Sequence, residues 1–318
     1  MADSWARATG QLQAVIVHVD VGTQALGAAM HNANSGRVPI LIFAGLCPYS
    51  EDSDFRGART EYQHWLQDIP DQKAIVGEYC RYVMLEWEKD GATPPAALPE
   101  NAVSIIAEAL VHAKSLFIIT GYPGWNHVCP AQLTKLANVV PGLRVFDTGG
   151  SEMCFPVSHL AYAGFRLSFD IIITEAGVIL VLDRDVPWIP SKNPPRKDAR
   201  IYYVDLDPLN SKIELSFFPA DARWRADSFT ALTQTNDHIS RTEKLQEVLH
   251  DPIYTKRWSN LADKHLSKLE AFSKLAVPPE NGMLDIHHVG AAIKKAVPND
   301  TVFVVEAATN SMPLLDQL

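Results

Sequence analysis

Short apolar runs alternate with helix-length segments along this chain, and this alternation restricts the fold more than any other feature of the sequence. The runs are largely unbroken stretches of Val, Ile, Leu and Phe, which is the pattern of parallel strands buried on both faces. The strands predicted in this way are Ala14–Val19, Val38–Ala44, Ser115–Thr120, Leu143–Phe146, Val178–Leu182, Arg200–Val204 and Val302–Val305. The helices predicted between them include Thr23–Ser35, Asp71–Trp87, Asn101–Ala113 and Pro130–Val139. Strand, helix and strand in repeated order predict an α/β fold of doubly wound parallel sheets.

Two breaks divide the chain. Asp90–Pro99 (DGATPPAALP) is rich in proline and indicates an interdomain linker, whereas Asp227–Lys274 is polar and helical in pattern. We therefore expect, in order, an α/β unit over residues 1–90, a linker over 91–99, a second α/β unit over 100–235, a helical connector over 236–283 and a last unit over 284–318.

Composition excludes several classes of protein. The chain has 28 Lys and Arg against 37 Asp and Glu, a net charge of −9, so it lacks the basic surface that nucleic-acid binding needs. Its longest apolar stretch, Ile171–Leu182, is interrupted by Glu175 and Gly177, so no membrane span is predicted. The four cysteines are far apart, which is typical of reduced thiols rather than of disulfides or zinc sites. Together with the lack of a secretory signal in Met1–Gly10, this predicts a cytoplasmic protein, unless an organellar transit peptide precedes Met1.

The segment Val15–Gly27 (VIVHVDVGTQALG) is the first candidate site, because a strand there leads into a polar loop and then a helix. Ligands of open α/β sheets bind at the carboxyl ends of strands, which favours His18, Asp20, Gly22 and Thr23 as site residues. Thr23 is also a candidate cap for the following helix. The alternative is that His18 is a hydrogen-bonded core histidine and the loop is an ordinary connection.

Two pairs of aspartates also follow predicted strands. Asp205 and Asp207 lie just past one strand, where an acid binds a ribose hydroxyl or caps a helix; capping is the favoured interpretation. Asp183 and Asp185 suit a metal pair, but a solvated turn anchored by Trp188 is favoured.

A glycine-containing turn, Thr120–Asn126 (TGYPGWN), follows another strand and would allow a phosphate to approach the backbone. It is neither GxGxxG nor followed by a Walker lysine, so a plain turn is favoured over a nucleotide site. His287–His288 lacks the helical spacing of zinc ligands, and no metal ligand is predicted.

Taken in order, these segments resemble the thiamine-diphosphate-dependent enzymes of the acetolactate synthase and benzoylformate decarboxylase type. Met1–Gly10 (MADSWARATG) is similar to that family's ADGYARATG segment, and Val15–Gly45 is similar to the second half of its pyrimidine-binding domain. Glu61–Tyr82 is similar to the stretch that closes that domain, and Ser104–Leu232 to the Rossmann-like central domain. Asp285–Leu318 is similar to the start of the diphosphate-binding domain.

The resemblance implies thiamine diphosphate and Mg²⁺ as cofactors, a 2-oxo acid as substrate, and a homodimer or tetramer with sites between subunits. It places His18 at the position of an active-site histidine, and Asp20, Gly22 and Thr23 in the loop near the substrate and pyrimidine. The family's activating glutamate would precede Met1, and its GDG…N signature for Mg²⁺ and diphosphate would follow Leu318. We therefore expect residues 1–318 alone to be inactive and not to bind the cofactor with Mg²⁺.

Three functions remain open. The first is a piece of a thiamine-diphosphate-dependent 2-oxo-acid lyase or carboligase. The second is a non-catalytic partner subunit of a full-length homologue. The third, that the central unit binds a nucleotide such as FAD, is disfavoured because no glycine fingerprint follows Thr120.

Overall fold

The computed structural model describes residues 1–45, 71–80, 97–148, 152–165, 171–209, 218–278, 282, 284–305 and 310–318. Its strands are β1 (Gln13–Val17), β2 (Ile40–Ala44), β3 (Leu116–Thr120), β4 (Leu143–Asp147), β5 (Tyr162–Gly164), β6 (Val178–Leu182), β7 (Arg200–Asp205) and β8 (Ala222–Arg225). Its α-helices are α1 (Ala2–Thr9), α2 (Val21–Gln24), α3 (Gly27–Ser35), α5 (Glu100–His112), α6 (Cys129–Val139), α7 (Ser228–Arg241), α8 (Glu243–Leu249), α9 (Pro252–Leu275), α10 (Ile286–Ala296) and α11 (Ser311–Gln317). Short 3₁₀ turns cover Gln72–Ile75, Gly77–Tyr79, Pro123–Trp125 and Ile171–Glu175.

A six-stranded parallel sheet in the order β5-β4-β3-β6-β7-β8 forms the centre of the molecule. The chain starts in the middle at β3, adds β4 and β5 on one side, and then returns to add β6, β7 and β8 on the other. The strand order reverses between the central strands β3 and β6. Open α/β sheets bind ligands at the carboxyl ends of the strands beside such a reversal. The predicted α/β fold with parallel sheets is confirmed.

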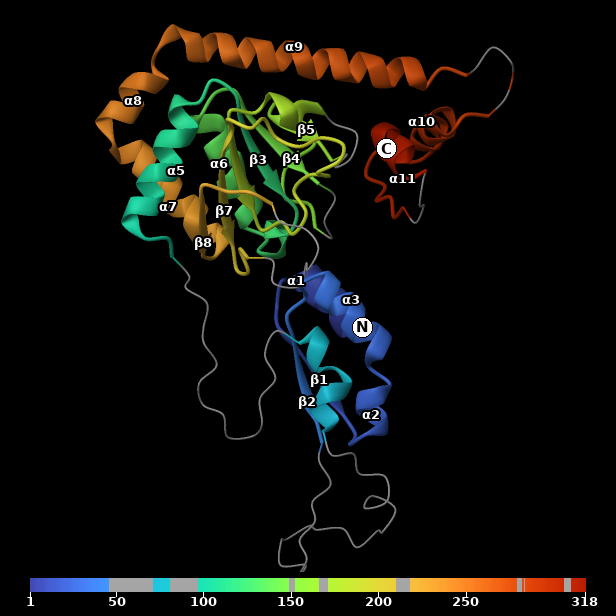
Figure 1. The fold of residues 1–318 in the computed structure, drawn as a ribbon. Helices are drawn as coiled ribbons and strands as arrows, with labels where there is room; N and C mark the ends of the chain where they lie inside the picture. The colour runs from blue at the N-terminus through green and yellow to red at the C-terminus, as the bar shows by residue number, and fades with distance from the viewer. Residues whose placement is uncertain are drawn as a thin grey trace, which may run out of the picture.

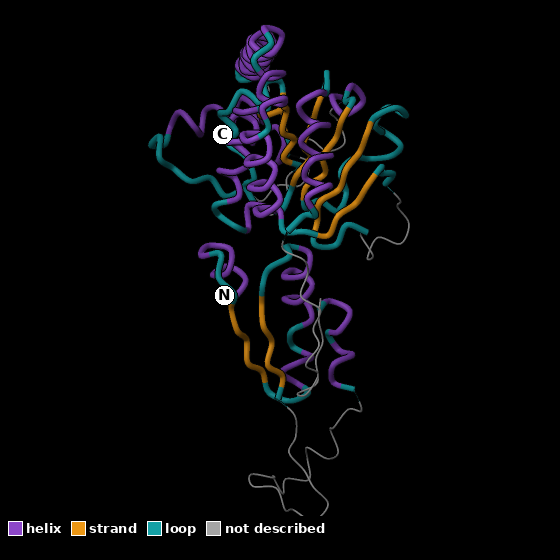
Figure 2. The backbone as a smooth tube through the Cα atoms, turned by 90° about the vertical axis from the view of Figure 1, so that its left-hand side faces the viewer, coloured by secondary structure: helices purple, strands orange, loops and turns teal. Residues whose placement is uncertain are grey.

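Both faces of this sheet are buried, which explains the continuous apolar runs. One face packs against α5, α6, α7 and α8 through side chains such as Ile118 and Leu180. The opposite face, with Phe117 and Val181, packs against the 3₁₀ turn at Ile173 and against loop side chains. Figure 2 shows the helices beside the strands of this sheet. The inner strands β3, β4 and β6 are buried at every position, so a polar substitution there has no solvated face to occupy.

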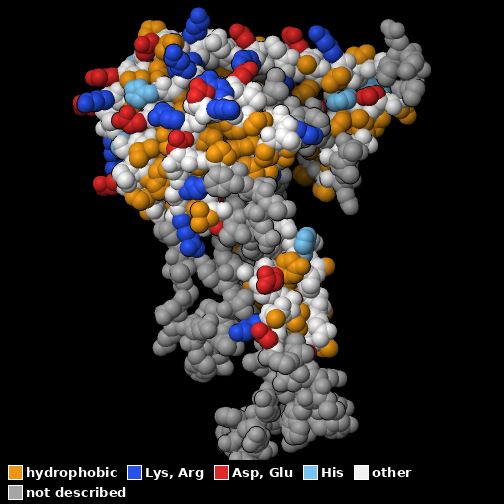
Figure 3. Space-filling view, viewed as in Figure 1, with side chains coloured by type: hydrophobic (Ala, Val, Ile, Leu, Met, Phe, Trp, Pro, Cys, Tyr) orange, Lys and Arg blue, Asp and Glu red, His pale blue; other side chains and the backbone are white. Residues whose placement is uncertain are grey.

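A smaller unit is built from α1, α2, α3 and the parallel pair β1–β2, and it lies below the large sheet in Figure 1. One face of the pair is exposed: Ile16 is 81 % exposed and Phe43, which lies opposite it, 59 %. The helices α9, α10 and α11 follow the large sheet, and the top of the molecule around α9 carries Lys, Arg, Asp and Glu side chains (Figure 3). None of the helices in the described part of the chain is long and apolar enough to cross a membrane.

Three predicted elements differ from the structure. The helix predicted over Thr23–Ser35 is two helices, because Leu26 N–H bonds to Thr23 O in a tight 3₁₀ turn. Over the described start of Asp71–Trp87 the chain forms 3₁₀ turns, and the rest of that segment lies outside the described residues. Val302–Val305 is not a strand, since no other described strand pairs with it.

The short strands β5 and β8 were missed by the sequence analysis. β8 lies at the edge of the sheet and contains arginines, so it lacks the apolar run used to identify the other strands. The domain boundaries stay a prediction, and most of the predicted linker 91–99 lies outside the described residues.

Candidate functional site

The loop between β1 and α2 lies at the carboxyl edge of the small sheet. Because β1 and β2 are parallel, both strands end at this edge, and Gly45 N–H donates to Val17 O at 3.1 Å. The loop carries the predicted site residues His18 and Asp20, and Thr23 follows in α2. The structure therefore brings them to the edge where a ligand of an α/β sheet is expected.

Asp20 has an unusual backbone conformation, with φ at +53°. A residue with a side chain at positive φ is strained by about 1–3 kcal/mol and persists only where other contacts hold it. Asp20 is 6 % exposed, and its N–H donates to Oε1 of Gln72 at 3.0 Å. The amide nitrogen of Gln72 donates in turn to Gly45 O, also at 3.0 Å. Gln72 therefore joins the loop to the end of β2.

Two oxygen atoms, one at the end of this loop and one in α2, are buried with no hydrogen-bond partner among the described residues: Oδ1 of Asp20 and Oγ1 of Thr23. Thr23 is 1 % exposed and lies inside α2, so its predicted role as the helix cap is wrong. The cap position belongs to Asp20, whose side chain makes no capping bond. An unpartnered buried oxygen costs about 1–3 kcal/mol, and a ligand with matching polar groups would remove that cost.

His18 and Gly22 complete the loop. His18 is exposed rather than a core histidine, and its Nδ1 lies 3.0 Å from Val19 O. This contact makes Nδ1 the donor, so Nε2 carries the lone pair of the neutral ring. A Cβ at Gly22 would lie 3.1 Å from Cβ of Val17, so a side chain there would fit only if β1 and this segment moved apart slightly.

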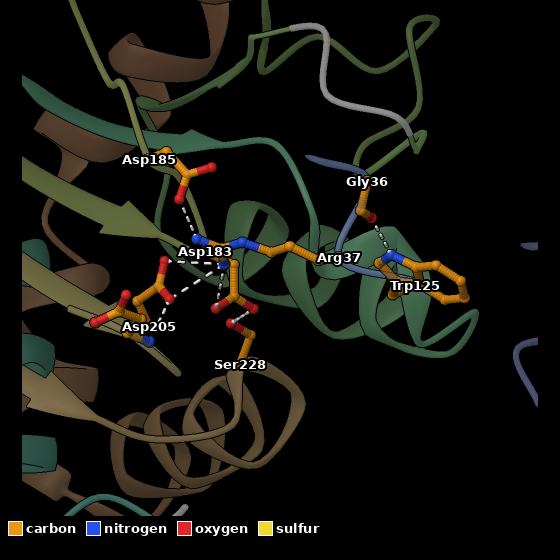
Figure 4. A network of polar contacts seen from close by, with 8 residues as sticks. Gly36, Arg37, Trp125, Asp183, Asp185, Asp205 and Ser228 are labelled. Atoms are coloured by element: carbon orange, nitrogen blue, oxygen red, sulfur yellow. Dashed lines mark hydrogen bonds and ion pairs between the residues drawn. The ribbon is translucent and has the colours of Figure 1, made fainter. Parts of the chain in front are cut away.

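A second polar cluster lies at the carboxyl edge of the large sheet, and Figure 4 shows it from close by. The guanidinium of Arg37, which follows α3, reaches across to aspartates at the ends of β6 and β7. Its Nη1 lies 3.1 Å from Oδ1 of Asp205 and 3.9 Å from Oδ1 of Asp183, and its Nη2 bonds to Asp185. Ser228 donates to the other oxygen of Asp183.

The charged groups in this cluster shift one another's pKa values. Burial raises the pKa of Asp183 to about 7, and the neighbouring Asp205 adds to this while Ser228 and Arg37 oppose it. Burial also raises the pKa of Asp205, against the pull of Arg37. Burial by itself would lower the pKa of Arg37, but Asp205, Asp185 and Asp183 together raise it above its ordinary value. The three aspartates therefore hold Arg37 as a cation, while burial favours the neutral forms of Asp183 and Asp205.

This arrangement corrects the sequence interpretation of the aspartates. The solvated turn predicted for Asp183 and Asp185 is wrong for Asp183, which is 9 % exposed, whereas the side chain of Asp185 is 37 % exposed and pairs with Arg37. None of the described helices is capped by Asp205, whose Oδ1 accepts hydrogen bonds from the N–H of Asp207 at 2.7 Å and from Nη1 of Arg37 at 3.1 Å. Among the residues that the structure describes, no group of three or more His, Cys, Asp or Glu side chains is arranged to hold a metal ion.

The turn at Thr120–Asn126 packs on the same edge. A Cβ at Gly121 would lie 2.8 Å from the side chain of Arg184, so this arginine packs directly against the glycine. Trp125 donates from its indole N–H to Gly36 O at 2.8 Å, beside Arg37. The turn thus contacts the small unit, and its interpretation as a plain turn stays a prediction.

Sequence reasoning missed Arg37 and Gln72. Arg37 lies in a short loop before a strand, a position with no distinguishing pattern, and its aspartate partners are about 150 residues away. Gln72 lies in a segment predicted as helix, where a glutamine is unremarkable. Only the fold brings either residue to its partners.

Comparison with known proteins identifies related folds. Residues 1–75 match the family model described as the N-terminal thiamine-pyrophosphate-binding domain of thiamine pyrophosphate enzymes. The structure of a thiamine diphosphate-dependent 4-hydroxybenzoylformate decarboxylase from Rhodococcus jostii RHA1 is similar over 100 % of this chain and 63 % of its own, with a TM-score of 0.61 and 15 % identity. A benzoylformate decarboxylase from Polynucleobacter necessarius is similar over 74 % of this chain and 51 % of its own, with a TM-score of 0.51 and 13 % identity.

At these identities the two structures show a shared fold, and this chain spans 63 % and 51 % of their lengths. No curated protein sequence matches the chain significantly.

Proposed function

We propose that this chain belongs to the thiamine-diphosphate-dependent enzymes and that its residues 1–75, which match the thiamine-pyrophosphate-binding domain, supply the pyrimidine-facing half of the cofactor site of a 2-oxo-acid lyase or carboligase. The observation that supports this proposal is the pair of buried, unpartnered oxygens on Asp20 and Thr23 at the carboxyl edge of β1 and β2. A carboxylate that accepts and a hydroxyl that donates suit an aminopyrimidine, which carries an amino group and ring nitrogens.

The residues of this chain would then have distinct roles. When bound, thiamine diphosphate supplies the carbon nucleophile for cleavage of a 2-oxo acid. The carboxylate of Asp20 would accept a hydrogen bond from the amino group of the pyrimidine, and the hydroxyl of Thr23 would donate one to a ring nitrogen. His18 is exposed at the end of β1, and its imidazole would exchange a proton with the substrate.

The other half of the site needs a separate source. The described residues contain no cluster suited to Mg²⁺, which thiamine diphosphate needs to neutralise its phosphates. We propose that a further polypeptide segment or a second subunit provides this half. Purified 1–318 is accordingly expected not to quench its tryptophan fluorescence saturably at micromolar cofactor with Mg²⁺.

Benzoylformate and 4-hydroxybenzoylformate are the first substrates to test, because the two similar structures are those of enzymes named as decarboxylases of these acids. The protein should be isolated from its own cells with whatever it binds, and assayed for carbon dioxide release from these acids and from pyruvate. His18→Ala is expected to lower turnover by about a hundredfold or more, the smaller end of proton-transfer contributions. The control His112→Ala, in the exposed part of α5, should have no effect. Failure of the native assembly to turn over any 2-oxo acid with cofactor and Mg²⁺ would refute the proposal.

A second candidate is a non-catalytic subunit that pairs with a full-length homologue. It is supported by the exposed apolar face of the small sheet, where Ile16, Leu41 and Phe43 are exposed. Co-purification of a longer homologue with an assembly that stays active after His18→Ala would favour it over the first candidate.

A further inference from the structure

Gln72 uses both ends of its side-chain amide to connect two backbone segments of the candidate site. Its Oε1 accepts the N–H of Asp20 and its Nε2 donates to the carbonyl of Gly45, each at 3.0 Å. The side chain is 7 % exposed, so these bonds are shielded from water. Gln72 lies 52 residues from Asp20 in sequence, and local folding alone does not bring them together.

The bond to Asp20 acts at the strained point of the loop. Asp20 is at φ +53°, which an L-residue adopts only where surrounding contacts hold it. Its backbone direction determines where its carboxylate points and where α2, with Thr23, begins. The amide of Gln72 is therefore the contact best placed to fix both unpartnered oxygens relative to the end of β2.

We infer that Gln72 is a positioning residue that holds the Asp20–Thr23 loop in its ligand-binding conformation without touching the ligand. The inference rests on the proposed function for the identity of that ligand, an aminopyrimidine. It does not depend on that function for its mechanical part, the restraint of the Asp20 backbone.

Three variants separate positioning from general stability. Gln72→Met has a similar length and removes both hydrogen bonds. Gln72→Glu keeps an acceptor for Asp20 N–H and loses the donor to Gly45 while ionised. Gln234→Met is the matched control: Gln234 also bonds to backbone with both amide atoms, to N–H and C=O of Leu98 at 2.9 and 3.0 Å, but far from the loop.

Amide hydrogen exchange at Asp20, measured by NMR on the full chain, tests the inference directly. Gln72→Met is expected to accelerate this exchange by about tenfold or more, since a shielded hydrogen bond protects the amide. Gln234→Met should leave it unchanged. Gln72→Glu should protect the amide more at about pH 4 than at about pH 8, because the neutral carboxyl can again donate to Gly45. Equal exchange in wild type and Gln72→Met, or equal acceleration in Gln234→Met, would overturn the inference.

The active assembly gives a second readout. Gln72→Met is expected to raise the cofactor concentration for half-maximal activity by about tenfold, while Gln234→Met leaves it unchanged. An assembly that turns over no 2-oxo acid would refute the proposed function alone, and the exchange experiment would still decide the role of Gln72. An unchanged cofactor requirement in an active Gln72→Met assembly would overturn the positioning role.

Discussion

Replacing Arg37 with Met is expected to destabilise the protein strongly and in a pH-dependent way. Methionine keeps most of the length of the side chain and, like arginine, has a Cβ, so the backbone strain at φ +55° is the same in both proteins. The change therefore removes the guanidinium and little else. It leaves Asp205, whose side chain is 1 % exposed, and Asp183, at 13 %, without their cation.

The magnitude follows from this burial. Removing one partner of a buried ion pair costs about 3–5 kcal/mol, because the remaining charge stays desolvated. Asp185 adds little, since its side chain is 37 % exposed and exposed pairs contribute at most about 1 kcal/mol. At about pH 8 we therefore expect the free energy of unfolding to fall by about 3–5 kcal/mol.

The sign of the pH dependence is fixed by the aspartates. Without Arg37 their folded-state pKa values, already raised, rise further above the unfolded value of about 3.9. A carboxyl with a raised folded pKa stabilises the protein at low pH and loses that contribution as the pH rises through the folded pKa. The difference between wild type and Arg37→Met should therefore be smaller near pH 5 than near pH 8, because Asp183, with a pKa of about 7, is protonated at the lower pH.

Urea unfolding followed by circular dichroism at about pH 5 and pH 8 measures both quantities. Arg196→Met is the control, because Arg196 makes only an exposed pair with Asp198, and it should not change stability measurably. In an Asp205→Asn background the cost of Arg37→Met should fall, which a double-mutant cycle detects. A cost below about 1 kcal/mol at pH 8, or the same cost at both pH values, would refute the reasoning.

Three other changes have defined outcomes. Burial raises the pKa of Asp147 from 3.8 to about 6, so wild type loses stability between pH 4 and pH 8 and Asp147→Asn does not. The free energy of unfolding of Asp147→Asn should therefore gain up to about 3 kcal/mol relative to wild type over this range, measured by urea unfolding. A difference between the two proteins that does not change with pH would contradict this. Gly124→Ala would place a Cβ 2.4 Å from Met153 O and should cost about 1–3 kcal/mol, whereas an unchanged thermal midpoint would show that the loop shifts freely. Thr23→Val removes an unpartnered buried hydroxyl, so it should keep or raise stability while raising the cofactor requirement of the active assembly; lower stability would indicate an unseen partner for the hydroxyl.

The sequence predicted the large sheet well, because the signal there is local. Each inner strand is buried on both faces, so its apolar run is visible without knowledge of its neighbours, and the predictions for β3, β4 and β6 agree with the structure within about a residue. The edge strand β8 and the exposed Val302–Val305 segment show the limit of this signal. Whether such a segment forms a strand depends on a neighbouring strand that supplies hydrogen bonds.

The candidate loop was located from sequence by the rule that parallel strands present their ligands at their carboxyl ends. What the sequence by itself determined is thus the α/β class, the inner strands and the position of His18, Asp20 and Thr23 at a strand end. The tertiary structure decided which polar groups in these loops are satisfied. It placed Arg37 among three distant aspartates and Gln72 on the strained backbone of Asp20, and it left Oδ1 of Asp20 and Oγ1 of Thr23 buried without a partner among the described residues. These contacts join residues roughly 50 to 170 positions apart, and their strength depends on burial, which local patterns do not encode.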